Sequence, residues 1–87
     1  MYITAVFIND PFSRELRIDC DELKVKTVKD GEICILPNFN DSIFEVKDTC
    51  IDVITTNKSI KKIKVINSGI IKYKNNTLTY FGNFEEN

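Results

Sequence analysis

The chain has 87 residues, which is the length of one domain, and 43% of them are hydrophobic, enough for a single small core. Twelve basic residues nearly balance thirteen acidic ones, and this balance favours neither nucleic acid nor an acidic membrane as a partner. The absence of His excludes His-based catalytic triads and His metal sites, and three glycines are too few for a phosphate-binding loop of the G-x-x-x-x-G-K type. We therefore expect no catalytic residue, no metal ion and no cofactor.

The apolar runs and the cysteines indicate the cellular compartment of the protein. No apolar run approaches the roughly 20 residues of a membrane helix, and no signal peptide is visible at the N-terminus. The cysteines, Cys20, Cys34 and Cys50, are odd in number and form no C-x-x-C pair, which predicts reduced thiols in a cytosolic protein. The simplest role for them is that of small buried hydrophobes, because a nucleophilic Cys would need a base beside it.

Alternation of apolar and polar residues, with turn signals about every ten residues, predicts an all-β fold, a small antiparallel β-sandwich of about nine to ten short strands. In chain order the expected strands are residues 2–8, 13–18, 23–27, 32–36, 43–46, 51–55, 60–66, 70–74 and 77–81. Asn9, Asp10 and Pro11 end the first strand, and Ser68-Gly69 suits a bulge or a tight corner. Residues 1–84 are expected to form the domain, and residues 85–87 a frayed tail.

The last hairpin can be predicted with its register. A two-residue turn at residues 75–76 places Tyr73 opposite Leu78 and Ile71 opposite Tyr80. Apolar residues then pair with apolar ones, and a slip of one residue would destroy both matches.

The preceding hairpin is predicted in the same way. A three-residue loop at residues 57–59 places Val53 opposite Ile63 and Asp52 opposite Lys64, which is a favourable cross-strand charge pair.

Six lysines and no acid lie between Lys58 and Lys74. Solvated strand faces and protected sheet edges explain such lysines, but a docking surface for an acidic partner would also contain them. The alternative function is therefore a stand-alone small β-barrel that binds nucleic acid or another anionic partner through the Lys58–Lys74 surface. Tyr73 and Tyr80 fall on the apolar face of their hairpin, so they are not placed to stack on bases, and no nucleic acid is expected.

Three blocks of the sequence resemble a known family. The residues from Asp30 to Asn38, D-G-E-I-C-I-L-P-N, resemble the G-E-apolar-G-apolar-L-P pattern in the N-terminal β-sandwich of the epsilon subunit of F-type ATP synthases. N-S-G-I-I-K-Y at residues 67–73 and N-T-L-T-Y-F at residues 76–81 resemble two further family blocks, in the same order and at the family's spacing. The sequence departs from the pattern at Cys34, where the family has its second Gly, and at Phe39, where it has His. The helical hairpin of the family does not follow, so its ATP-sensing and braking roles are not expected here.

The resemblance implies a non-catalytic rotor subunit in the central stalk of an F-type or F-type-like ATPase. Such a subunit grips the gamma subunit, meets the polar loops of the c ring where a ring is present, and contacts the catalytic alpha/beta hexamer only indirectly. It implies a peripheral subunit of a membrane-associated complex, on the cytoplasmic side of the inner or plasma membrane. The residues that it places toward the c ring are Asp30, Gly31 and Glu32. The residues that it places toward gamma are Asn38, Phe39, Ile43 and Phe44. Replacing Phe39 with Asp is then expected to weaken assembly and to leave the isolated domain folded.

Overall fold

The computed structural model describes residues 1–9 and 14–86. Its strands are β1 (Ile3–Asn9), β2 (Arg14–Thr27), β3 (Gly31–Ile35), β4 (Ser42–Lys47), β5 (Cys50–Thr55), β6 (Ile60–Lys74) and β7 (Thr77–Glu86). The predicted all-β class is confirmed, and the described part of the chain has no helix that could cross a membrane. The turn predicted at Asp10 and Pro11 lies outside the described residues.

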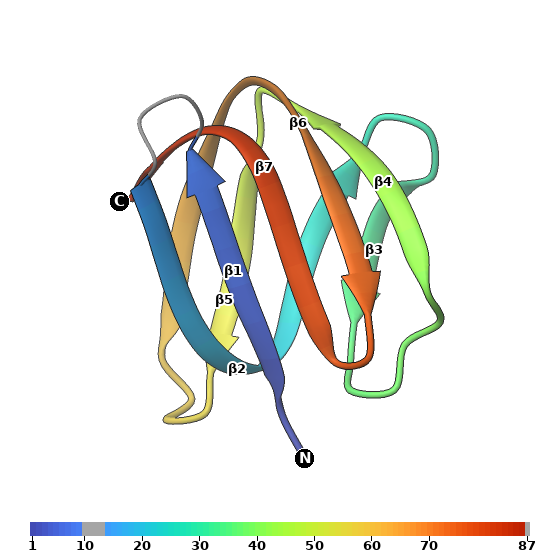
Figure 1. Ribbon diagram of the computed structural model, residues 1–87, viewed down its shortest axis with the longest axis vertical. Coiled ribbons are helices and arrows are strands. Elements are labelled where there is room, and N and C mark those ends of the chain that lie inside the picture. The colour runs from blue at the N-terminus through green and yellow to red at the C-terminus, as the bar shows by residue number, and fades with distance from the viewer. Residues whose placement is uncertain (10–13, 87) are drawn as a thin grey trace.

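The strands form one continuous sheet that folds over itself into two layers (Figure 1). The first layer contains β3, the second half of β2, β5, the first half of β6 and the end of β7. The second layer contains β4, the second half of β6, the first part of β7, β1 and the first half of β2. Three strands thus belong to both layers, and the pairing of β1 with β2 closes the sheet on itself.

The structure has seven strands rather than nine to ten, because two expected breaks are β-bulges inside continuous strands. The pairing of β2 with β5 shifts register between Cys20 and Glu22, and that of β6 with β7 shifts between Ile66 and Gly69. A bulge bends a strand and increases its twist without ending it. The predicted antiparallel sandwich has one parallel pairing, between β1 and β7.

The bulge in β6 depends on glycine because a tyrosine ring lies against the backbone there. A Cβ atom on Gly69 would overlap the ring of Tyr80. The Tyr80 hydroxyl donates a hydrogen bond of 2.7 Å to the carbonyl oxygen of Asn83. The ring therefore occupies the space that a larger residue at position 69 would need. The hydrogen bond of its hydroxyl stabilises the bend of β7.

The core lies between the two layers and has an aromatic group at its centre. The ring centroids of Phe7, Tyr80 and Phe84 are 5.8–6.1 Å apart, a range typical of favourable aromatic pairs. The other fully enclosed large side chains are those of Tyr73, Ile3, Leu23, Ile35, Ile51, Ile63, Ile71, Leu78, Val25 and Val46.

The end of the chain is held in the sheet as far as it is described. Glu85 and Glu86 pair with β6 as the last residues of β7. The Arg14 Nη2 atom lies 2.7 Å from a carboxylate oxygen of Glu86, and the Arg14 guanidinium covers the Phe84 ring at 4.9 Å. The frayed tail expected at residues 85–87 is thus wrong for Glu85 and Glu86, since β6 and Arg14 hold them, and Asn87 lies outside the described residues.

The last hairpin is confirmed in turn and in register. Tyr73 pairs with Leu78 and Ile71 with Tyr80. Asn75 and Asn76 have φ values of 51° and 56°, the left-handed conformation that asparagine adopts more easily than most residues.

The preceding hairpin has a loop of the predicted length, but its register is wrong. The loop comprises residues 56–58, closed by the Thr55 N–H donating to the Ser59 carbonyl at 2.8 Å. Asp52 therefore faces Lys62 rather than Lys64. Lys58 takes the left-handed conformation, with φ of 68°, as in three-residue loops that end in a left-handed residue.

Candidate functional site

The turn predicted to face a partner ring is exposed at the point where β2 leads into β3. The Thr27 hydroxyl accepts a hydrogen bond from the Asp30 N–H at 2.9 Å and donates one to the Gly31 carbonyl at 2.8 Å. Gly31 has φ of 71°, which favours glycine. Because the hydroxyl fixes the backbone, the carboxylates of Asp30 and Glu32 are presented to solvent on an ordered turn.

The segment of residues 38–44 divides between core and surface. Phe39 is partly buried, and its ring meets the ring of Tyr73 edge-on at 5.7 Å and that of Phe44 at 6.3 Å. Ile43 is 69% exposed on β4. The exposed Asn38 donates its N–H to the side chain of Asn76 at 2.7 Å. Of the four predicted residues, Ile43 and Asn38 are thus presented to solvent, while Phe39 and Phe44 seal the edge of the core.

The two predicted groups approach each other only in part. The turn at residues 30–32 lies at one end of β3, and Asn38 and Phe39 follow its other end, so a strand that spans roughly 16 Å separates them. β4 then returns toward the turn, because the Val28 N–H, two residues before Asp30, donates to the carbonyl of Glu45, the residue after Phe44.

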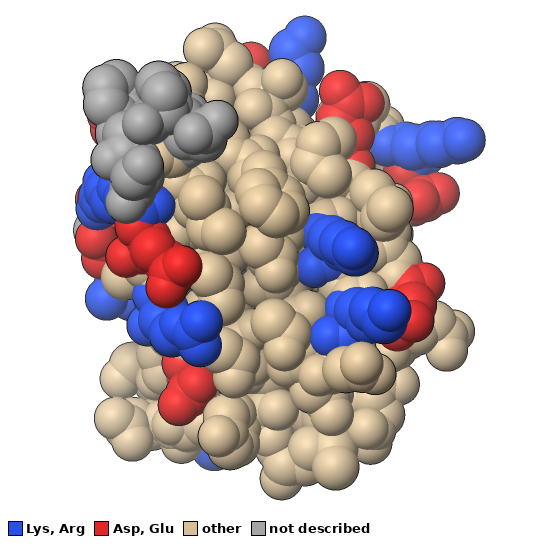
Figure 2. All heavy atoms as spheres, viewed as in Figure 1, with Lys and Arg blue, Asp and Glu red and all other residues tan. Residues whose placement is uncertain are grey.

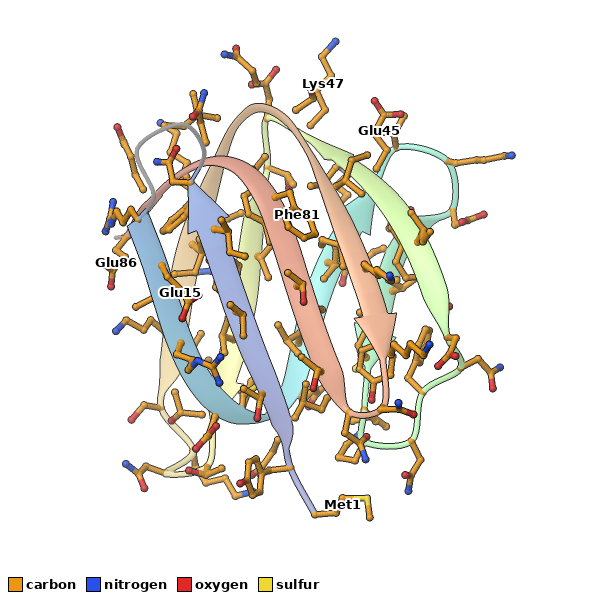
Figure 3. All side chains as sticks on the ribbon, viewed as in Figure 1. Met1, Glu15, Glu45, Lys47, Phe81 and Glu86 are labelled. Carbon is orange, nitrogen blue, oxygen red and sulfur yellow. The ribbon has the colours of Figure 1, made fainter. Side chains whose placement is uncertain are left out.

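The outward face of the second layer contains a row of apolar side chains across three adjacent strands. Ile8 of β1 pairs with Phe81 of β7, which pairs with Ile70 of β6. Phe81 is 45% exposed and Ile70 is 44% exposed. We call these three residues the apolar row. Glu15 of β2 adjoins Ile8, and Glu45 of β4 adjoins Ile70, so a carboxylate borders each end, and Figure 3 shows Phe81 between these two glutamates.

The next row of the same face mixes apolar and basic groups. Val6 pairs with Arg17 on β2 and with Thr79 on β7, and Thr79 pairs with Lys72. Lys72 in turn pairs with the exposed Ile43. Figure 2 shows the result, an uncharged band through the middle of this face with charged side chains on both sides.

The outward face of the first layer is different, because charges of both signs alternate across it. Lys24 pairs with Asp52, whose carboxylate lies 2.9 Å from the Nζ atom of Lys62. Lys26 pairs with Glu32 in the adjacent row. Side chains that neutralise one another in this way suit a face in contact with water. The two outer faces of the domain are therefore chemically distinct.

The apolar row was not predicted from the sequence, although a signal for it is present. A strand with one face in water alternates apolar and polar residues. Phe7-Ile8, Ile70-Ile71 and Tyr80-Phe81 instead place two large apolar residues in succession, so that each pair contributes one side chain to each face of its strand. Three such breaks on adjacent strands indicate a layer that is apolar on both faces.

The six lysines between Lys58 and Lys74 do not form one surface. Lys62 and Lys64 project from the first layer, and Lys72 and Lys74 from the second. Lys58 contacts the carboxylate of Asp21. Lys61 lies 3.5 Å from Glu86. The basic docking surface considered from the sequence is therefore divided between two faces and partly neutralised.

The cysteines are free thiols in different surroundings. Burial raises the pKa of Cys20 to about 11, and a hydrogen bond with Glu22 raises the pKa of the exposed Cys34. Both effects disfavour the thiolate, which is the nucleophilic form. Cys50 is exposed, so the expectation of small buried hydrophobes holds for Cys20 alone. Within residues 1–9 and 14–86, no three His, Cys, Asp or Glu side chains are grouped as metal ligands would be.

Comparison with known proteins relates the fold to two solved assemblies. A chain in the structure of the OSCP/F1/c-ring part of the Euglena gracilis mitochondrial ATP synthase superposes with a TM-score of 0.84 at 8% sequence identity, over 98% of this chain and 53% of that one. A chain in the central stalk/c-ring structure of the Tetrahymena thermophila mitochondrial ATP synthase superposes with a TM-score of 0.73 at 13% identity, over 98% of this chain and 66% of that one.

No family model and no curated protein matches the sequence. The solved structures therefore establish a shared fold, and this chain spans about half to two thirds of the length of the two chains that it matches.

Proposed function

We propose that this chain is a non-catalytic central-stalk subunit, epsilon-like, of an F-type or F-type-like ATPase, and that it docks on a gamma-like subunit through the outward face of the second layer. The observation that carries the proposal is the apolar row of Ile8, Phe81 and Ile70, which are adjacent on three strands, on a domain whose other outer face carries paired charges. A monomeric protein seldom leaves adjacent large apolar residues in water, because their burial contributes free energy to association.

The known structures of this fold support the choice of complex. Both chains that superpose on this one come from mitochondrial ATP synthase structures, one of them named for the central stalk and c-ring. The sequence blocks that resemble the epsilon family lead independently to the same type of complex.

The candidate residues take separate roles in this proposal. Ile43 lies on β4 in the row next to the apolar row, opposite Lys72, and contacts the gamma-like subunit beside it. Phe39 and Phe44 support that edge from within, by packing on each other and, for Phe39, on Tyr73. The exposed Asp30 and Glu32, with Gly31 between them, face the polar loops of a c ring where one is present. Exposed ion pairs contribute about 0–1 kcal/mol each, so this turn orients the domain more than it binds.

The fold supports a mechanical role. A rotor coupling must transmit torque without bending, and a sheet that closes on itself around one core meets that need. The chain performs no chemistry in this role. It is a peripheral subunit on the cytoplasmic side of the inner or plasma membrane, and it contacts the alpha/beta hexamer only through gamma.

The direct test is co-expression with the gamma-like subunit of the same organism, followed by size-exclusion chromatography and mass spectrometry. The proposal predicts a stable one-to-one complex. Separate elution of the two chains at micromolar concentration would contradict it.

A further inference from the structure

We propose that an extended segment of the partner adds a strand to the free edge of β3. The inference rests on the proposed function for the identity of that partner, the gamma-like subunit. It concerns a second contact, separate from the apolar row, since β3 belongs to the first layer.

The edge of β3 is open along its length. In the described part of the chain, β3 pairs with β2 alone, and no other backbone hydrogen bond reaches residues 32–35. An open edge presents unpaired N–H and C=O groups, which form a template for another strand.

The other open sides of the sandwich each carry a contact from the domain's own residues. The edge of β4 receives a hydrogen bond of 2.9 Å from the Val28 N–H to the Glu45 carbonyl. On the opposite side of the domain, the ion pair of Arg14 with Glu86 and the packing of Arg14 on Phe84 join the two layers. β3 also lacks the lysines and the proline that commonly protect an edge strand.

Apolar side chains along β3 are left incompletely covered. Ile33 points inward, like its neighbours Val25 and Ile35, which are both fully buried, but Ile33 remains partly exposed at the open edge. Leu36 is 52% exposed just after β3, and Val28 is 55% exposed just before it. An added strand would cover Ile33 and contact these two.

The chemistry of the added segment follows from the alternation of side chains. The partner residue opposite Ile33 lies on the inner face and must be apolar, whereas the residue opposite Glu32 lies on the outer face, where Lys or Arg would pair with the carboxylate. The Val28 hydrogen bond joins the start of this edge to Glu45, at the end of the apolar row. One partner can therefore reach both contacts.

Hydrogen exchange at single amides tests the inference. In the complex with the co-expressed gamma-like subunit, alternate amides of residues 31–35 should exchange at least about tenfold more slowly than in the isolated chain, because only every second N–H faces the open edge. Unchanged exchange of all these amides in a complex that does form would overturn the inference.

A pair of proline variants gives a second test. Neighbouring residues of a strand direct their N–H groups to opposite edges, so Ile33→Pro and Cys34→Pro remove donors on opposite sides of β3. The variant that keeps the wild-type melting temperature has lost only the outward donor, and it should bind the gamma-like subunit about tenfold more weakly. Unchanged affinity of that folded variant would overturn the inference, and if neither variant folds, the exchange experiment decides.

The two proposals fail in different ways. If Ile70→Asp abolishes binding while β3 exchange and the folded proline variant are unaffected, strand addition is wrong and docking by the apolar row stands. If the wild-type chain forms no complex with the gamma-like subunit, the proposed function fails and this inference fails with it.

Discussion

Replacing Ile70 with Asp should separate docking from folding. Burying an isoleucine contributes about 1.5–3 kcal/mol, and Ile70 is 44% exposed, so docking gains about 1 kcal/mol from this side chain. A carboxylate in its place would have to lose its water without a partner, which costs about 3 kcal/mol more. The sum, about 4 kcal/mol, predicts a loss of affinity for the gamma-like subunit of nearly a thousandfold. The isolated domain should lose only about 1–2 kcal/mol of unfolding free energy.

The matched control lies on the same strand. Ile60 of β6 is 65% exposed, but it projects from the first layer, on the charged face. Ile60→Asp should therefore leave the affinity within about twofold of wild type. Titration calorimetry would measure both affinities, and urea unfolding would show that both variants are folded. Equal affinities of the two variants would refute the assignment of the apolar row.

Four further predictions test the packing and the titrating groups. Gly69→Ala should lower the unfolding free energy by about 2–3 kcal/mol in a urea titration, because the added Cβ would overlap the Tyr80 ring. A second substitution, Tyr80→Leu, in the same chain should recover part of this loss. If the losses of the two single variants simply add in the double variant, the contact is contradicted. Phe39→Asp should cost about 2–3 kcal/mol in the same assay, because Phe39 packs on Tyr73. A stability equal to that of the wild type would contradict this packing. Burial raises the pKa of Tyr80 to about 12, above its unfolded value of about 10, so its contribution to the unfolding free energy is complete below pH 10 and is lost as the pH rises toward 12. A Tyr80→Phe variant should therefore show a shallower decline over this range, and an unchanged decline would contradict the burial of the hydroxyl. Iodoacetamide at pH 8 should label Cys50 first and Cys34 more slowly, because the hydrogen bond with Glu22 raises the pKa of Cys34. Cys20 should be labelled only after unfolding, and rapid labelling of Cys20 in the folded protein, detected by mass spectrometry, would contradict its burial.

The two hairpins explain when a register can be predicted from sequence. At residues 75–76, two asparagines permit a tight turn, and a slip of one residue would reverse every face. In the hairpin closed by Thr55 and Ser59, the predicted and observed registers differ by two residues, so both keep the same faces. Asp52 has a lysine opposite it in either register. Alternation and charge pairing therefore could not distinguish the two.

The number of strands was overestimated because a bulge and a turn share sequence signals. The polar residues around Cys20 and the Ser68-Gly69 pair interrupt the apolar pattern as a turn would. In the structure both are bulges that bend a long strand from one layer to the other. Whether a chain reverses or only bends at such a place depends on the strands that it pairs with, and these are distant in the sequence.

The candidate site was partly predictable. Ile43 stands outward, as a docking residue must, whereas Phe39 is turned toward Tyr73. Ile70 and Phe81 could have been found from the successive apolar residues of their strands. That they stand side by side follows from the pairing of β6 with β7. The roles of Asp30, Gly31 and Glu32 toward a c ring remain predictions.

The most direct test of the rotor assignment is gentle affinity purification of the protein from its own cells, with mass spectrometry of the partners and an ATPase assay of the particle. We predict that it is recovered with alpha-, beta- and gamma-like subunits in a particle that hydrolyses ATP. Recovery of the protein alone, or with nucleic acid in place of these subunits, would contradict the assignment.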